Sequence, residues 1–483
     1  MAKRLTELKT ERIKKLKRLK ELGINPYPTS FAKKQDILTC RQSLGKKVQT
    51  AGRLLSLRGH GRILFADLQD QSGKIQLFFQ EKVLNKDQFK LLKFVDIADF
   101  LGVSGQVIKT KAGEITIDVS SFKFLSKAIR PLPGAWHGLK DKEERFRKRY
   151  LDLLLDPEVR RRFQVRSDLV RYLRDFLHQK GYTEVETPTL QALYGGTNAK
   201  PFSTHLNALS TKMYLRIADE LYLKRCVVGG FERVFEICKD FRNEGMDQNH
   251  SPEFSMLEFY EAYADYQKII ERTEALIKYC AQKIFGKEEL TVKGKKITLS
   301  GSWPQITMTE AVKKYLHLDY EKTSQKELYR FGRSHKVELE ATDPKGALLY
   351  KIFDRLVTEK LIQPTWVLDY PQEASPLAKA HPQKPGFAER FEGYIGGMEL
   401  CDGWSEINDP ADQLARFEAD QATGKEDAHP VDQEFITALE HGMPPLGGIG
   451  IGIDRLSMFF TDCWSIREVI LFPLMRPRKK IKK

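Results

Sequence analysis

The chain contains 483 residues, of which 41% are hydrophobic and 30% are charged, and its formal net charge is +15 at pH 7. This length is too great for one ordinary core, and the composition excludes a disordered chain, so a soluble globular protein of two or more domains is expected. The positive charge favours a polyanionic partner, because Lys and Arg neutralise nucleic-acid phosphates, although a merely basic protein is the alternative.

The cysteines and the apolar segments indicate the compartment. Six cysteines are scattered without a Cys-x-x-Cys pair, which favours reduced thiols over zinc ligands or disulfides. The chain is charged from Lys3 onward and has no apolar signal region. No apolar run approaches the roughly 20 residues that a membrane span needs. We therefore expect a cytoplasmic protein without a membrane segment.

Residues 1–46 are expected to form a basic helical extension. Leucines recur near helical spacing in residues 5–22, and Gly23 and Pro26 are expected to end this helix. Such a helix could contact RNA or could simply dock through its leucines, and the pattern does not decide between the two. The basic tail, 476–483, is expected to be disordered or to face RNA.

Residues 47–127 are expected to form a small β-barrel. Short alternating strands are expected at 48–55, 63–68, 74–79, 100–108 and 115–124. Five strands in about 80 residues fit a closed barrel of the oligonucleotide-binding kind. Phe65, with Phe78 or Phe79, could stack on unpaired bases, and Arg58 and Gln76 lie nearby in sequence. The alternative is that these phenylalanines belong to the core.

The rest of the chain is expected to form one large domain, 142–483, after a linker at 128–141. The run Arg-Pro-Leu-Pro-Gly at 130–134 cannot continue a helix or a central strand. Helices are expected at 142–154 and 157–181. Strands and helices then mix without regular βαβ alternation, which favours an antiparallel sheet flanked by helices over a doubly wound fold. The expected fold class is therefore α+β.

The most informative stretch of the chain joins two expected strands, 234–242 and 254–263. Every second residue of a strand lies on the same face, so one face of the later strand carries Phe254, Met256, Glu258 and Tyr260. An unpaired glutamate would be costly in a hydrophobic core. This face is therefore predicted to form the floor of a polar pocket.

The loop between these strands carries groups that bind phosphate. Arg242 ends the first strand, where its guanidinium could grip a phosphate through two hydrogen bonds, and a charged His250 could reach a terminal phosphate. A surface ion pair is the alternative for Arg242. The chain has no Gly-x-x-x-x-Gly-Lys-Ser/Thr loop and no Gly-x-Gly-x-x-Gly turn between a strand and a helix. A triphosphate would therefore be held by side chains and metal, not by a helix N-terminus.

A second signature is the run Gly-Ile-Gly-Ile-Gly-Ile-Asp-Arg at 448–455. Its glycines remove side chains from a strand, which allows close approach by a ligand or another backbone. Arg455 then opens an apolar helix, where its planar cation could stack on adenine opposite Phe254.

Three carboxylates, Glu392, Glu399 and Glu406, recur around a Gly-Gly pair at 396–397. A two-residue turn there would pair Tyr394 with Glu399 and Glu392 with Cys401. Glu392 and Glu399 would then lie diagonally on one face, about 7–8 Å apart. Mg²⁺ bound by carboxylates and substrate phosphates fits this arrangement, and solvated hairpin glutamates are the alternative.

With these motifs the chain resembles the bacterial-type class II lysyl-tRNA synthetases, within the class II aminoacyl-tRNA synthetases. The resemblance runs from residue 23 nearly to the end. The run Glu-Val-Glu-Thr-Pro at 184–188 looks like the first motif of the family, which builds the dimer interface around Pro188. Residues 241–261 look like the second motif, and 448–459 look like the third.

The resemblance implies a fold, a reaction and partners. It implies a six-stranded antiparallel catalytic sheet, a barrel that reads the anticodon, and a homodimer. The implied enzyme activates L-lysine with ATP to lysyl-adenylate and transfers lysine to the 3′ end of tRNA(Lys). It also implies Mg²⁺ as the cofactor, about three ions per subunit, bound by carboxylates and phosphates.

The resemblance further implies roles for individual residues. Catalysis would rest on Arg242 and Arg455, and the magnesium ligands would be Glu392 and Glu399. ATP would contact Arg242, Glu244, His250, Phe254, Glu392, Glu399 and Arg455. Lysine would contact Gly196, Glu220, Arg242, Glu258, Tyr260, Asp402, Trp404 and Glu406, with Tyr260 and Glu406 receiving its ε-ammonium. The anticodon would contact Arg58, Phe65 and Gln76.

The chain departs from the usual family pattern mainly in one hairpin. Cys401, Asp402 and Trp404 replace a small residue, an asparagine and a smaller aromatic residue, and Asp219 replaces a usual proline. Two other functions are weighed against the synthetase. An enzyme that modifies a protein lysine would match only the catalytic half, and an RNA-binding protein without catalysis would lack the arginines and histidine of the motifs.

Overall fold

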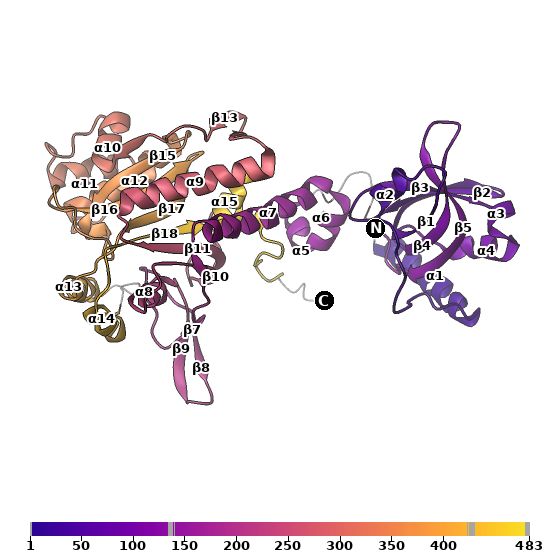
Figure 1. Ribbon diagram of the computed structural model, residues 1–483, viewed down its shortest axis with the longest axis horizontal. Helices are drawn as coiled ribbons and strands as arrows, with labels where there is room; N and C mark the ends of the chain where they lie inside the picture. Colours follow the sequence, from indigo (N-terminus) through magenta and orange to yellow (C-terminus); the bar gives the residue numbers. More distant parts are fainter. Residues whose placement is uncertain (1, 134–138, 140, 423, 425–429, 479–483) are drawn as a thin grey trace. The chain divides into compact units, whose positions relative to one another are not determined.

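The computed structural model describes residues 2–133, 139, 141–422, 424 and 430–478 (Figure 1). The chain divides into two compact units, Met1–Lys140 and Asp141–Lys483. Positions 134–138 and 140 of the expected linker, and 479–483 of the basic tail, lie outside the described residues. Along the described part of the chain, no helix combines the length and apolar character needed to cross a membrane.

The first unit contains the predicted barrel, which closes in the strand order β1-β2-β3-β5-β4. Its strands are β1 (Lys47–His60), β2 (Ile63–Gln69), β3 (Lys74–Gln80), β4 (Phe100–Lys109) and β5 (Ile115–Ser126). Short helices precede the barrel or connect β3 to β4: α2 (Ile37–Arg41), α3 (Glu81–Leu84), α4 (Lys86–Leu91) and η1 (Leu92–Phe94). Alternate side chains along β2 and β3 enter the core, among them Leu68, Leu77 and Phe79.

Helix α1 (Ala2–Glu21) is held to the barrel mainly by polar anchors. Arg12 is buried and its Nη1 donates to the carbonyl of Ala128 at 3.0 Å, and Lys15 pairs with Asp96 at 2.7 Å. Leu19 is fully buried, but the other leucines of the stripe are partly or largely exposed. The leucine stripe therefore contributes one core residue to the docking of this helix.

The second unit is built on an eight-stranded mixed sheet in the order β14-β15-β16-β17-β18-β11-β10-β6. Its strands are β6 (Thr183–Glu184), β10 (Arg233–Phe241), β11 (Glu253–Ala262), β14 (Gln305–Thr307), β15 (Thr365–Pro371), β16 (Phe387–Ile395), β17 (Met398–Ser405) and β18 (Leu446–Gly452). The six central strands pair antiparallel, whereas the short edge strands β14 and β6 pair parallel to their neighbours. The α+β class is confirmed, and the expected six strands gain one short strand at each edge.

Helices surround this sheet, and two small sheets extend from it. The helices are α5 (Lys142–Arg147), α6 (Arg149–Leu155), α7 (Pro157–Gln179), α8 (Glu220–Val228), α9 (Tyr266–Phe285), α10 (Met308–Leu316), α11 (Gln325–Ser334), α12 (Lys345–Leu356), α13 (Pro410–Gln421), α14 (Gln433–Glu440), α15 (Ile453–Phe460) and α16 (Ile466–Val469), with short turns η2 (Thr358–Lys360) and η3 (Gln372–Ala374). The small sheets are β7 (Leu190–Gln191), β8 (Ser203–Leu206) and β9 (Thr211–Leu215), and β12 (Glu289–Val292) with β13 (Lys295–Thr298).

The single helix expected at 142–154 is divided in two. Lys148 separates α5 from α6 with a φ of −117° and a ψ of 46°, which is not helical. The break places the fully buried Arg149 at the start of α6, where its guanidinium donates to the carbonyl of Arg467 at 2.6 Å and pairs with Asp152. The next helix starts as expected, with Pro157 in its first turn and the Asp156 side chain accepting from the Glu158 amide.

The two faces of the large sheet differ in character because side chains alternate along each strand. On one face, Leu257, Phe259, Ile449 and Ile451 pack into a hydrophobic core with α7, α9 and α15. Residues between them on β11 and β18, such as Glu258, point to the opposite face. The sheet therefore separates an apolar core from a charged surface across one layer of backbone.

The hairpin of β16 and β17 contains a β-bulge that the sequence analysis did not predict. Tyr394 faces Glu399 as expected, but the register then shifts at Leu400, and Glu392 faces Asp402 instead of Cys401. The expected pairing of Glu392 with Cys401 was wrong by one residue. Because of the bulge, Glu399 and Asp402 lie on the same face although they are three residues apart, and Cys401 is buried in the core.

Candidate active site

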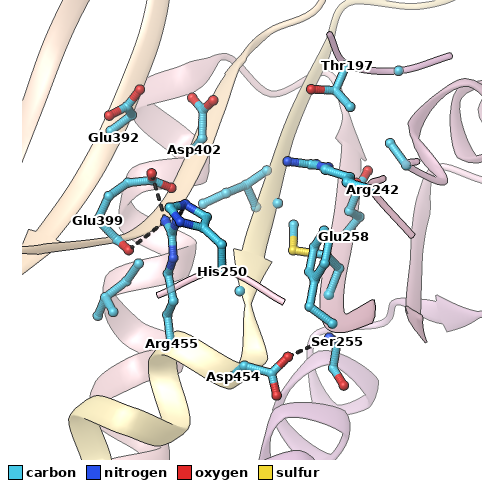
Figure 2. Close-up of a pocket in the computed structure, with 18 of the residues that line it drawn as sticks. Thr197, Arg242, His250, Ser255, Glu258, Glu392, Glu399, Asp402, Asp454 and Arg455 are labelled. Carbon is cyan, nitrogen blue, oxygen red and sulfur yellow. Dashed lines mark hydrogen bonds and ion pairs between the residues drawn. The ribbon is translucent and has the colours of Figure 1, made fainter. Parts of the chain in front are cut away.

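The charged face of the large sheet forms the floor of a pocket of about 340 Å³. Strands β11, β16, β17 and β18 supply the floor, and the loop after β10 and the start of α15 supply the walls (Figure 2). Most of the residues singled out from the sequence line this one pocket: Gly196, Glu220, Arg242, Glu244, His250, Phe254, Glu258, Tyr260, Glu392, Glu399, Asp402, Trp404 and Arg455. Residues separated by up to 259 positions, Gly196 and Arg455, thus share one cavity.

Glycines in β18 make the pocket floor accessible. A Cβ atom at Gly448 would lie 2.3 Å from the Tyr260 ring and 2.4 Å from Oε1 of Glu406, and one at Gly450 would lie 2.9 Å from Met256. Side chains at these positions would therefore displace the residues that face the cavity. This close approach explains the repeated glycines of the second signature.

The pocket presents two arginines and a histidine, with Arg242 across the cavity from Arg455 and His250. The guanidinium of Arg242 lies 5.0 Å from the centroid of the Phe254 ring, and its Nε donates to the carbonyl of Ile217 at 3.3 Å. Among the described residues, Arg242 makes no ion pair with a carboxylate, so its charge is available to an anion.

The second arginine, Arg455, lies beside Glu399 and His250. Its Nη1 donates to Oε2 of Glu399 at 2.9 Å, and its Nη2 lies 3.1 Å from Nε2 of His250 (Figure 2). Asp247 in turn holds Nδ1 of His250 at 2.8 Å. These contacts fix the orientation of the arginine and the histidine at the mouth of the pocket.

Three carboxylates and two arginines on β16, β17 and α15 form neighbouring ion pairs, which we call the carboxylate network. Arg390 donates to both oxygens of Asp402 at 2.9 Å and to Glu392 at 2.7 Å. Burial raises the pKa of Glu392 to about 8, against the opposing effect of Arg390. Burial also tends to raise the pKa of Glu399, but Arg455 holds it below its ordinary value. The charge of Asp402, which stands where the family usually has an asparagine, is therefore matched by Arg390.

This network fits a divalent cation by its donor chemistry. Glu392 and Glu399 both line the cavity, and the hard carboxylate oxygens that they offer are the ligands that Mg²⁺ prefers. Figure 2 shows Glu392, Glu399 and Asp402 grouped on the side of the pocket opposite Arg242 and Glu258. A substrate phosphate bound between these two groups would contact Mg²⁺ on the carboxylate side and Arg242 on the other side.

A buried lysine that was not predicted from the sequence lies beside Glu220, behind the residues that line the pocket. Lys224 is fully buried and pairs with Glu220, four residues earlier on α8, and with Glu406. Burial alone would lower the pKa of Lys224, but the two carboxylates raise it above its ordinary value. The Glu-x-x-x-Lys spacing on a helix was the available signal, but it is normally a sign of an exposed pair.

Beside Lys224, one carboxylate oxygen of Glu406 accepts no hydrogen bond from the described residues. Its Oε2 accepts from Nε1 of Trp404 at 2.8 Å and from Lys224, whereas its Oε1 is buried and has no hydrogen-bond partner among the described residues. Burial raises the pKa of Glu406 to about 8 in the absence of a further cation. An unsatisfied buried carboxylate oxygen is suited to receive an ammonium group.

The barrel residues singled out from the sequence lie together on its outer surface. Arg58 faces Phe65 across β1 and β2, and Phe65 faces Phe78 across β2 and β3. The rings of Phe65 and Phe78 are stacked with centroids 4.5 Å apart, and both are partly exposed. Gln76 lies two residues from Phe78 and therefore on the same face. Phe79 is a core residue, so Phe65 and Phe78 are the rings that a base could reach.

Comparison with known proteins agrees with this geometry. A family described as "tRNA synthetases class II (D, K and N)" matches residues 141–476, and one described as "OB-fold nucleic acid binding domain" matches residues 48–125. These two ranges contain the pocket and the barrel respectively.

Relatives of the chain match over almost its whole length. A protein named "Lysine--tRNA ligase" from Carboxydothermus hydrogenoformans is 48% identical, over 98% of this chain and 99% of its own. Proteins of the same name from Methanoculleus marisnigri and Fervidobacterium nodosum are 47% and 45% identical, over 97% and 99% of this chain and 94% and 96% of their own. Together with the family that covers 141–476, these matches show that the chain belongs to the class II tRNA synthetases of the D, K and N group.

Proposed function

We propose that the chain is a lysine–tRNA ligase, which activates L-lysine with ATP and transfers lysine to the 3′ end of tRNA(Lys). The observation that carries the choice of lysine is the buried Oε1 of Glu406, near the Tyr260 end of the pocket, which has no hydrogen-bond partner among the described residues. An ammonium at that position satisfies the oxygen, whereas an uncharged side chain leaves it desolvated and unpaired. The names of the relatives support the same substrate.

The first reaction joins the lysine carboxylate to the α-phosphate of ATP, and pyrophosphate leaves. Arg242 is placed to hold both reacting groups, because its guanidinium is unpaired and lies between the Phe254 ring and the amino-acid end of the pocket. Phe254 and Glu244 would hold the adenine, and His250 and Arg455 would face the other phosphates. Positioning and charge stabilisation suffice for such a step, and no covalent protein intermediate is needed.

At the other end, the α-ammonium would lie near Gly196, Glu220 and Glu258, and the ε-ammonium near Tyr260 and Glu406. Glu392 and Glu399 would hold Mg²⁺, which neutralises phosphate charge when it is bound. The expected number of about three ions exceeds what two carboxylates bind, so the phosphates of ATP would supply further ligands.

The same proposal includes the tRNA and the assembly. The outer barrel face with Arg58, Phe65 and Gln76 would bind the anticodon, and the residues 47–127 would form the anticodon-binding domain. The chain would act in the cytoplasm as a homodimer. Phe472 is 69% exposed and Leu474 is 53% exposed, and apolar side chains of this size suit a subunit interface near the end of the large unit.

Glu406→Gln tests the amino-acid assignment. We expect kcat/KM for lysine in ATP–pyrophosphate exchange to fall at least ~30-fold, the scale of truncating a buried charge pair, while KM for ATP stays unchanged. The control is Glu418→Gln at an exposed position of α13, which removes the same charge and should leave kcat/KM for lysine unchanged. A folded Glu406→Gln protein that keeps its preference for lysine would contradict the assignment.

Arg242→Ala tests the reaction chemistry. Removing this guanidinium deprives the transition state of a charge clamp, so lysine-dependent ATP–pyrophosphate exchange should fall at least ~100-fold. Arg333→Ala on α11 removes an exposed arginine outside the pocket and serves as the control. Near-normal exchange by a correctly folded Arg242→Ala protein would refute the proposed role.

Phe65→Ala tests the barrel. Loss of one stacked base costs about 1–3 kcal/mol, so KM for tRNA in aminoacylation should rise about 5- to 150-fold while exchange is unchanged. Leu44→Ala removes a different exposed apolar side chain of the same unit and should leave both activities intact. If Phe65→Ala charges tRNA normally, the barrel face binds the anticodon by other residues or not at all.

Asp402→Asn tests the carboxylate network. The variant removes one negative charge beside Glu392 and leaves Arg390 to that glutamate alone, so the network should attract cations less strongly. We expect lysine to remain the preferred amino acid and the Mg²⁺ concentration for half-maximal exchange to rise at least ~3-fold. Asp412→Asn on α13 is the matched control. Superimposable magnesium titrations for Asp402→Asn and the parent would show that this charge has no part in metal binding.

A further inference from the structure

A second group of carboxylates lies beside the pocket, on the same face of the sheet and apart from Glu392 and Glu399. Asp219 caps the start of α8, Asp240 lies on β10, and Glu258 lies on β11. One oxygen from each comes within 4.8 Å of the other two. Asp219 and Asp240 are fully buried and Glu258 is 6% exposed.

These three carboxylates have fewer close partners than the other carboxylates of the pocket. Neither oxygen of Asp219, nor Oδ2 of Asp240, has a hydrogen-bond partner among the described residues. Burial raises the pKa of Asp240 to about 6, against the opposing charges of Arg242 and Arg216. Nε of Arg216 lies 3.5 Å from Asp240, but that arginine makes its closer contact, 2.7 Å, with Glu236. Glu258 accepts the hydroxyl of Tyr260 at 2.8 Å, and its carboxyl lies beside that of Asp219.

Such a group is unfavourable unless a positive charge or protons enter it. Burial and the neighbouring Asp240 raise the pKa of Asp219, and burial with the neighbouring Asp219 raises that of Glu258. These directions mean that the three charges repel one another strongly when no cation is present. A metal ion relieves this repulsion and satisfies the bare oxygens at the same time.

The geometry favours an oxygen-preferring ion. Metal–oxygen distances of about 2.0–2.6 Å keep the ligand oxygens of one ion within about 5 Å of one another, which these oxygens satisfy. A second combination, Asp219 with Glu236 and Cys238, is equally compact. Glu236, however, is engaged by Arg216 and by the amide of Thr187 at 3.0 Å, and burial raises the pKa of the Cys238 thiol.

We propose that Asp219, Asp240 and Glu258 bind a divalent, oxygen-preferring cation at a site separate from the one assigned to Glu392 and Glu399. Glu258 belongs both to this site and to the pocket lining, so the ion would lie next to the amino-acid end of the cavity, toward β10. The two sites occupy different strands, β10 and β11 against β16 and β17. The inference does not depend on the ligase function, because binding of the ion needs neither ATP nor tRNA.

Binding of Mn²⁺ to the full-length chain, followed by electron paramagnetic resonance without ATP, tests the site. The starting protein is the Glu392→Gln/Glu399→Gln variant, in which the other carboxylate pair is neutralised. We expect this protein to retain a tightly bound Mn²⁺ ion, and the ion to be lost when Asp219→Asn is added. Cys238→Ala, added instead, should keep the ion, because the thiol is not a ligand of the proposed site.

Thermal unfolding of the same proteins tests whether the loss of bound Mn²⁺ is specific. Asp219→Asn removes an unpaired buried charge, so the metal-free variant should unfold at a higher temperature than its parent. Addition of Mn²⁺ should raise the unfolding temperature of the parent and leave that of Asp219→Asn unchanged. Asp240→Asn provides an independent loss of a ligand. Failure of the Glu392→Gln/Glu399→Gln protein to bind Mn²⁺, or equal binding after Asp219→Asn and Asp240→Asn, would overturn the site.

Discussion

The alternation of side chains along six antiparallel strands determines how the large unit can hold so many charges in its interior. Residues such as Leu257 and Ile451 face the helices, and their neighbours Glu258 and Gly450 face the pocket. One sheet therefore serves as the wall of a hydrophobic core and as the floor of a charged cavity. The apolar face provides the burial that stabilises the fold, and it holds the strands that position the polar groups.

Charge pairing is the second requirement, because each carboxylate on this face is costly without a cation. Glu399 pairs with Arg455, and Glu392 and Asp402 share Arg390. Lys224 similarly lies between two glutamates. These pairs hold their side chains in place before a ligand arrives, so less ordering is needed when one binds. The unused oxygens that remain define where further positive charge can enter.

The fold was largely predictable because its strands and helices follow simple periodic patterns. The alternation in β2 and β3 predicts the barrel, and Pro157 with Asp156 predicts the start of α7. The pocket membership of Phe254, Glu258 and Tyr260 follows from period two along one strand. The break at Lys148 could not be predicted in this way, because no proline or glycine lies at it. Arg149, which follows the break and is buried, donates to backbone carbonyls more than 300 residues later in the chain.

Partners brought together by tertiary structure were also missed. The pairing of Asp402 with Arg390 was not predicted, because no cation is adjacent to Asp402 in the sequence and only the facing strand brings Arg390 to it. The burial of Lys224 was not predicted for a related reason, because an i,i+4 pair with Glu220 on a short helix suggests an exposed contact. The predicted pairing of Glu392 was wrong for a third reason. A bulge inserts Leu400 into β17, and no glycine or proline is adjacent to Leu400 in the sequence.

That bulge makes the face on which the carboxylates of the β16–β17 hairpin lie depend on the strand pairing as well as on their spacing. Leu400 is the extra residue that lets Glu399 and Asp402, three positions apart, share a face. Substituting it with another apolar residue preserves this arrangement, because the count of residues is unchanged. Deleting it would leave the two carboxylates two positions apart in a regular ladder, where they again share a face. Related hairpins should therefore occur both with the bulge residue and without it, with both carboxylates on the pocket face in either form.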